Sequence, residues 1–190
     1  MPTGAIHLCV GKRVLEKLNI NESMNYYIGT VSADSWRNSS STKMGTHFLD
    51  SNDSIDYHYD VFYNKYFRCM DNVFVFGYLV HLITDKYWYR SNFITSNIYE
   101  DDYDDLKRLC SSLIKYYNIP KLFLPELDNP ISELDSSGII YTIDYLNDVD
   151  YVDGESVSFD IDLVKSSIEK TSDFIICELE RLKNLVGVIS

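Results

Sequence analysis

Apolar residues recur every three to four positions along most of the chain, which is the spacing of amphipathic helices. Thr3 is placed to cap a first helix that presents Ile6, Val10 and Val14 on one face. The same pattern predicts helices over residues 4–18, 24–33, 57–70, 72–90, 103–117 and about 159–186, with a shorter one within 129–145.

The stretch from Asn72 to Arg90 is apolar nearly all round, so we expect it to be the central, buried helix. Asp71 stands directly before this stretch and is its predicted N-cap. Gly77 lies inside the stretch and permits close packing against another helix.

Two long segments interrupt the helical pattern. Residues 35–56 are rich in Ser, Asn, Asp and Thr, and we predict a long ordered loop of the kind that is usually functional. Pro120, Pro125 and Pro130 punctuate an irregular segment at about 118–158. The chain is therefore predicted to be all-α, a single-domain multi-helix bundle spanning residues 1–190.

Charge and cysteine usage narrow the functional classes. The 190 residues include 29 acidic and 17 basic side chains, a formal charge of −12, which argues against binding to duplex nucleic acid. The four widely spaced cysteines are predicted to be reduced and buried. No secretory signal and no apolar run of about 18 residues is visible, so we predict a cytoplasmic protein without a transmembrane segment.

The four histidines, His7, His47, His58 and His81, all lie in the first 81 residues. His81 and Asp85 are four residues apart on the central helix, so imidazole and carboxylate share one face. A buried unpaired carboxylate is costly, and a metal ion would satisfy both groups at once. A hydrogen-bonded His–Asp pair in a core without any metal is the alternative.

The other candidates are less specific by themselves. His7 sits mid-helix among apolar residues, where a core role is common. Asp34 follows a helix C-terminus, which is unfavourable for a carboxylate, so it needs a compensating charge or lies in a solvated turn. His47 falls in the polar loop, while His58 and Trp88 are predicted to support the site or line its pocket.

The order of these residues resembles the zinc-dependent phospholipase C family, which shares its all-α metal-cluster fold with single-strand-specific nucleases. The resemblance covers about residues 1–90 and rests on the string GYLVHLITDKYW at 77–88, together with Asp34 and the His47-Phe48 pair upstream. It implies a metal-binding half at about 1–95, containing a metal-binding central helix.

The resemblance also implies a ligand set. Asp34, His47, His81 and Asp85 would hold one zinc ion, and His7 would bind a second that Asp85 bridges. The family's third zinc uses two later histidines and a glutamate, but this chain has no histidine after His81. Nothing in the sequence singles out the carboxylates that could replace them, such as Asp101, Asp102 and Glu178.

The sequence thus predicts a metal-dependent hydrolase, a phosphoesterase with one or two zinc ions, although another divalent metal would also suit these ligands. Asp34 is the predicted catalytic carboxylate, which would orient or deprotonate the attacking water. The substrate would be a phosphoester small molecule or a lipid head group. The alternatives are a non-catalytic, metal-stabilised helical binding domain, or a helical protein without metal.

Overall fold

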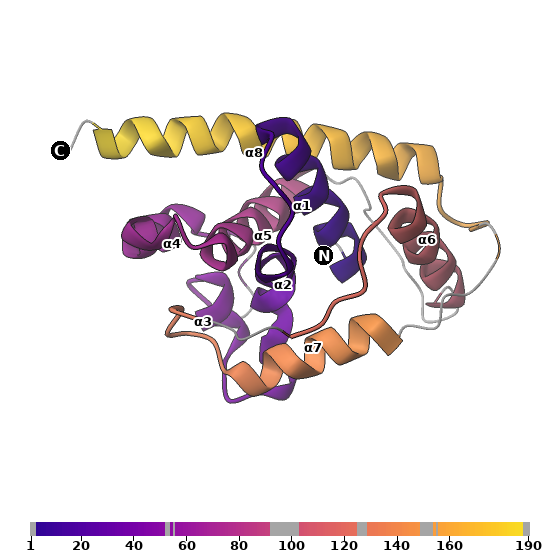
Figure 1. The fold of residues 1–190 in the computed structure, drawn as a ribbon, viewed down its shortest axis with the longest axis horizontal. Helices are drawn as coiled ribbons and strands as arrows, with labels where there is room; N and C mark the ends of the chain where they lie inside the picture. Colours follow the sequence, from indigo (N-terminus) through magenta and orange to yellow (C-terminus); the bar gives the residue numbers. More distant parts are fainter. Residues whose placement is uncertain are drawn as a thin grey trace.

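The computed structural model of the protein describes residues 3–51, 54, 56–91, 103–124, 129–148, 154 and 156–187. Over these residues the fold is all-α, as predicted, with eight α-helices, two short 3₁₀ helices and no strand (Figure 1). The α-helices are α1 (Gly4–Leu18), α2 (Met24–Ser32), α3 (Lys43–His47), α4 (Tyr59–Tyr66), α5 (Val73–Ser91), α6 (Tyr103–Tyr116), α7 (Ser136–Asp148) and α8 (Ile161–Gly187); the 3₁₀ helices are η1 (Ala33–Asn38) and η2 (Phe67–Cys69).

Helix α1 has the boundaries that the sequence predicts. The Thr3 hydroxyl accepts a hydrogen bond from the Ile6 amide at 3.3 Å, which satisfies one of the free donors of the first turn. Asn19 ends the helix in the left-handed conformation, with φ of 54°. The helix therefore starts and stops through its own flanking residues.

Helices α2 and α5 pack unusually close to each other. A Cβ atom added at Gly29 of α2 would lie 2.2 Å from the Phe74 carbonyl oxygen of α5. A Cβ atom added at Gly77 of α5 would lie 2.3 Å from the Tyr26 carbonyl oxygen of α2. The two backbones can approach this closely only because neither glycine has a side chain.

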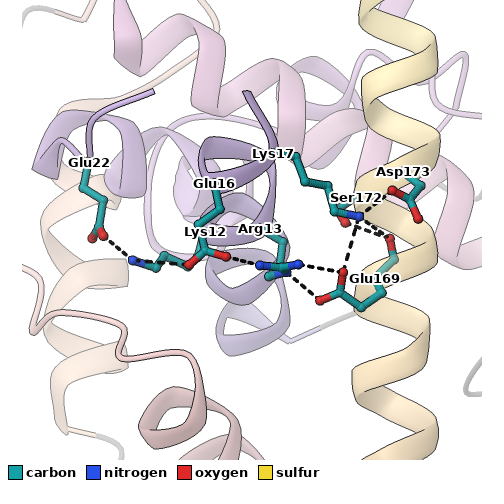
Figure 2. Close-up of polar contacts among 8 residues, drawn as sticks. All are labelled: Lys12, Arg13, Glu16, Lys17, Glu22, Glu169, Ser172 and Asp173. Atoms are coloured by element: carbon teal, nitrogen blue, oxygen red, sulfur yellow. Dashed lines mark hydrogen bonds and ion pairs between the residues drawn. The ribbon is translucent and has the colours of Figure 1, made fainter. Parts of the chain in front are cut away.

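Helix α8 runs across α1, and ion pairs join the two helices (Figure 2). Arg13 Nε donates to Glu169 Oε1 at 2.5 Å, and Lys17 Nζ donates to Asp173 Oδ1 at 2.5 Å. These side chains are partly exposed, so each pair contributes little to the free energy of unfolding, on the order of 0–1 kcal/mol. We assign them to fixing the relative position of the two helices.

The segment at residues 35–56, predicted as an ordered loop, contains helical structure that was not expected. It contains most of η1 and the whole of α3, where the Thr42 hydroxyl accepts from the Gly45 amide at 3.1 Å. Phe48 then ends α3 with φ of 54°. The polar composition that predicts a loop also supplies helix caps, and this is why short helices were missed there.

The segment at 118–158 contains all of α7, which begins later than the predicted helix start at 129. Asp135 Oδ1 accepts from the Ser137 amide at 2.9 Å and so caps the first turn. Pro125 lies outside the described residues. The N-cap predicted for the central helix is also wrong by one residue, because Asn72 Oδ1, rather than Asp71, accepts from the Phe74 amide at 2.9 Å.

The cysteine prediction holds for two of the four thiols. Cys9 and Cys110 are buried, whereas Cys69 is half-buried and Cys177 is exposed, and all four are free. The exposed thiol arises because Cys177 faces away from the core contact of α8 that Ile175 and Leu179 make. No helix within the described ranges is long and apolar enough to cross a membrane.

Replacing Gly77 tests the close contact of α2 and α5. We expect Gly77→Ala to lower the free energy of unfolding by about 1–3 kcal/mol or more, since backbone atoms must move apart. Urea unfolding followed by circular dichroism measures this. Gly45→Ala is the control, because a Cβ there meets only the Thr42 hydroxyl within 4 Å, at 3.2 Å. Equal stabilities of the two variants would contradict the interpretation.

Candidate metal centre

Five side chains from four elements converge at the middle of the fold. They are the five ligands that the sequence predicts: His7 from α1, Asp34 from η1, His47 from α3, and His81 and Asp85 from α5. Their nitrogen and oxygen atoms form two overlapping groups that could hold a metal ion, one of His7, Asp34 and His81 and the other of His47, His81 and Asp85, with ligand atoms within 4.8 Å of one another.

The site is almost completely buried. His7, His47, His81 and Asp85 are 0–1% exposed, and Asp34 is 18% exposed. Both nitrogens of His7, both carboxylate oxygens of Asp85 and Oδ1 of Asp34 are buried without a hydrogen-bond partner. Leaving so many polar atoms unpaired would cost several kcal/mol, so this cluster requires a compensating group.

Two hydrogen bonds fix the orientation of the paired imidazoles. His81 Nδ1 lies 2.8 Å from the Thr30 carbonyl oxygen, to which it can only donate. His47 Nδ1 lies 3.0 Å from the Thr46 hydroxyl, which itself donates to the Lys43 carbonyl at 3.4 Å and therefore accepts from the ring. Each ring thus keeps a lone pair on Nε2, and these two atoms face each other at 3.4 Å. When both rings are neutral, two lone pairs at this distance repel each other unless a metal ion or a proton lies between them.

The spacing of the ligand atoms fits a shared ion. His47 Nε2 and His81 Nε2 each lie 3.4 Å from Asp85 Oδ2, and Asp34 Oδ1 lies 3.6 Å from His47 Nε2. Such distances are long for hydrogen bonds, which favour about 2.9–3.0 Å. They match ligands around one zinc ion, because bonds of about 2.0–2.1 Å at tetrahedral angles separate two ligand atoms by roughly 3.3–3.4 Å.

His7 approaches the same carboxylate from its other side. His7 Nε2 lies 3.3 Å from Asp85 Oδ1, the oxygen that does not face His47 and His81. The His7 ring also stacks on that of His81, with centroids 3.8 Å apart and planes 8° apart. Asp85 therefore presents one oxygen to each part of the cluster, as a carboxylate that bridges two ions would.

Protonation of the cluster follows from burial and from the charges inside it. Burial and the neighbouring His81 lower the pKa of His7, so this ring is neutral near pH 7. Burial also disfavours a charged His81, but the adjacent Asp85 outweighs it and raises the pKa of His81. Burial opposes ionisation of Asp85, and the nearby His81 and His7 rings outweigh it and hold the pKa of Asp85 well below its ordinary value. The carboxylate is therefore charged and ready to bind a cation.

The remaining predicted site residues are His58, Trp88 and the carboxylates considered for a third zinc. His58 Nε2 is 3.0 Å from Asp50 Oδ2, a pair that does not join the cluster. Trp88 is buried on α5, three residues beyond Asp85. Glu178, considered for a third zinc, instead accepts from the Tyr59 hydroxyl at 2.6 Å. The other residues considered, Asp101 and Asp102, lie outside the described residues.

Thr30 and Thr46 were not anticipated from the sequence. Thr30 acts through its backbone carbonyl, which no side-chain pattern reveals, and it reaches His81 because α2 and α5 pack so closely. Thr46 directly precedes His47, and a hydroxyl residue next to a candidate histidine was the available signal. Searches found no matching family model, curated protein or solved structure for this chain.

Removing the Thr46 hydroxyl should weaken metal binding. We expect Thr46→Val to lower zinc affinity by about 10–100-fold, because His47 loses the acceptor that fixes its tautomer. Competition against a chelating dye measures the affinity. Thr171→Val is the control, since the buried Thr171 hydroxyl donates to the Ser167 carbonyl at 2.7 Å in α8 and does not join the cluster. Similar affinities of both variants would argue against an orienting role for Thr46.

Proposed function

We propose that this protein is a metal-dependent phosphoesterase whose centre holds one or two zinc ions. The observation that carries the proposal is the convergence of buried nitrogen and carboxylate oxygen atoms at 3.3–3.6 Å, several of them without a hydrogen-bond partner. Imidazole nitrogen with carboxylate oxygen is a normal donor set for zinc. The resemblance of residues 1–90 to zinc-dependent phospholipases C supports the same metal and the same reaction class.

The residues of the cluster would have different roles in binding metal. His47, His81 and Asp85 would hold the first ion, and His7 with the second oxygen of Asp85 would contribute to another. When bound, a divalent ion would lower the pKa of a coordinated water from its bulk value to about 7 and withdraw charge from a phosphoryl oxygen. The chain's own contribution is to hold these ligands in a dry, fixed arrangement, with tautomers set by Thr30 and Thr46.

Asp34 is the proposed catalytic carboxylate. It is the most exposed of the five cluster residues and also borders a cavity of about 260 Å³. Burial opposes its ionisation, but the neighbouring His47 and His81 outweigh it and hold the pKa of Asp34 below its ordinary value. Asp34 would therefore be ionised near neutral pH, able to orient a water in the cavity and to accept its proton. Arg37 lines the same cavity and would place a positive charge beside an anionic substrate.

A non-catalytic metal site is the second candidate function. Asp34, His47, His81 and Asp85 would complete four ligands, and closed four-ligand sites are typical of structural zinc. The near-complete burial of three of these residues favours this interpretation. Metal removal would then unfold the protein, and no hydrolysis would be found.

Metal content and hydrolysis, measured together, separate the two functions. We expect the purified protein to hold one or two zinc ions and to cleave bis(p-nitrophenyl) phosphate, with chelation abolishing the reaction and zinc restoring it. Elemental analysis should show that His81→Gln loses the metal, because it removes a ligand that both groups share. His58→Gln is the matched control, since His58 pairs with Asp50 outside the cluster.

Three outcomes of this experiment are informative. Zinc without hydrolysis would favour the structural site. A wild-type protein that takes up no zinc would contradict both proposed functions. Equal metal loss in the two histidine variants would show that the cluster is not the binding site.

Asp34 should affect turnover more than metal content. We expect Asp34→Asn to lower kcat by about 10²–10⁴-fold, the usual contribution of a general base, while His47, His81 and Asp85 still retain at least one ion. Steady-state kinetics on the zinc-loaded protein and elemental analysis check both parts. Asp50→Asn, an exposed carboxylate paired with His58, should leave kcat unchanged. An unchanged kcat in Asp34→Asn would remove the catalytic role.

A further inference from the structure

A second cavity lies beside the proposed site, between the start of α1, helix α6 and the end of α7. Its volume is about 100 Å³. Most of its walls are aliphatic, and the residues that line it include Leu8, Leu106, Ile114, Ile119, Leu122 and Leu146. An apolar cavity of this kind favours a hydrocarbon over water.

One polar atom in the wall of this apolar cavity has no partner. Ser111, 3% exposed, lines the cavity, and its hydroxyl is buried without a hydrogen-bond partner. Buried hydroxyls are normally paired, so this one is a polar point in an otherwise aliphatic wall, and an alkyl chain alone would leave it unpaired.

The apolar cavity adjoins the cavity that borders Asp34. The two share five lining residues: Thr3, Gly4, Leu106, Tyr145 and Leu146. Asp34 and the exposed Arg37 line this second cavity, and no ion pair among the described residues uses Arg37. A basic side chain and an apolar cavity thus lie on the two sides of a shared wall.

We infer that the two adjoining cavities together bind a phosphoester of a single medium-length apolar alcohol, with the phosphate beside Arg37 and Asp34 and the alkyl chain in the apolar cavity. This inference rests on the proposed function for the reaction, but the binding itself requires only the two cavities. The expected substrate therefore has one hydrocarbon chain attached to a negatively charged head group.

The size of the apolar cavity limits the chain. A single water needs about 10–15 Å³ by the same measure, so the cavity admits roughly seven to ten groups of that size. A chain of roughly six to eight carbons fits this space, whereas the two long chains of a bilayer phospholipid do not.

Binding of alkylphosphonates tests the inference without any turnover, since their carbon–phosphorus bond is not hydrolysed. Isothermal titration of the zinc-loaded protein should show octylphosphonate binding at least about tenfold more tightly than methylphosphonate, because added methylenes are buried. Octanol, which lacks the charged head, should bind more weakly than octylphosphonate. Vesicles of two-chain phosphatidylcholine should not compete with octylphosphonate.

Two pairs of variants locate the chain and the head. Ser111→Leu fills the cavity and should abolish the advantage of octyl over methyl, whereas Ser111→Ala leaves the space open and should keep it. Ile114→Phe, from the partly exposed wall, gives the same test if Ser111→Leu does not fold. Arg37→Gln should weaken the binding of octylphosphonate but not that of octanol. Arg68→Gln is the matched control, because both arginines are exposed and lie beside an aromatic ring, at 5.5 Å and 5.6 Å from the ring centroid.

Several results would overturn the inference. Equal affinity for methyl- and octylphosphonate, retention of the octyl advantage in both cavity-filling variants, or preferential binding to vesicles would each do so. Failure of the proposed function looks different: octylphosphonate would bind as expected, while p-nitrophenyl octyl phosphate would remain uncleaved by the zinc-loaded protein.

Discussion

The burial of Asp85 on an apolar helix is the constraint on which the rest of the centre depends. A carboxylate that is 1% exposed and has no hydrogen bond to either oxygen is strongly unfavourable by itself. Three imidazoles lie within 3.4 Å of its two oxygens. His81 is one helical turn away on the same helix, and His7 and His47 come from other parts of the chain. Protons alone would serve this cluster poorly, because the stacked rings of His7 and His81 cannot both be charged without strong repulsion.

The same constraint explains why α2 and α5 approach so closely. His81 can offer Nε2 to the centre only if Nδ1 has an acceptor, and the Thr30 carbonyl supplies it at 2.8 Å. That carbonyl is within reach because Gly29 and Gly77, which have no side chains, allow the backbones of α2 and α5 to approach each other closely. The packing of α2 against α5 therefore also orients a ligand of the site. A change that separates the two helices would remove the acceptor that holds the ring of His81.

Periodicity was sufficient for the long helices and insufficient for the short ones. Helix α1 and the buried central helix were predicted because each has an apolar pattern and most of its length lies in the core. Helix α3 was missed because five residues are too few to show a helical period of apolar positions. Its N-cap, Thr42, is also a residue type common in loops. Among the ligands, the His81–Asp85 pair follows from helical spacing, but the convergence of Asp34 and His47 depends on how η1 and α3 fold onto α5. Only the family resemblance placed those two in the centre.

The asymmetry of the cluster decides what a metal there could do. Four of the five side chains are sealed from solvent, so a substrate cannot reach the centre from the side of α1, α3 or α5. Asp34 alone is partly exposed, and the cavity beside it also carries Arg37 and the surface of α7. A purely structural site gains nothing from a basic residue and an open space next to one of its ligands, whereas a hydrolytic site can use the space for substrate and the basic residue for its negative charge. The arrangement on the Asp34 side is thus the physical argument for proposing a catalytic rather than a purely structural metal centre.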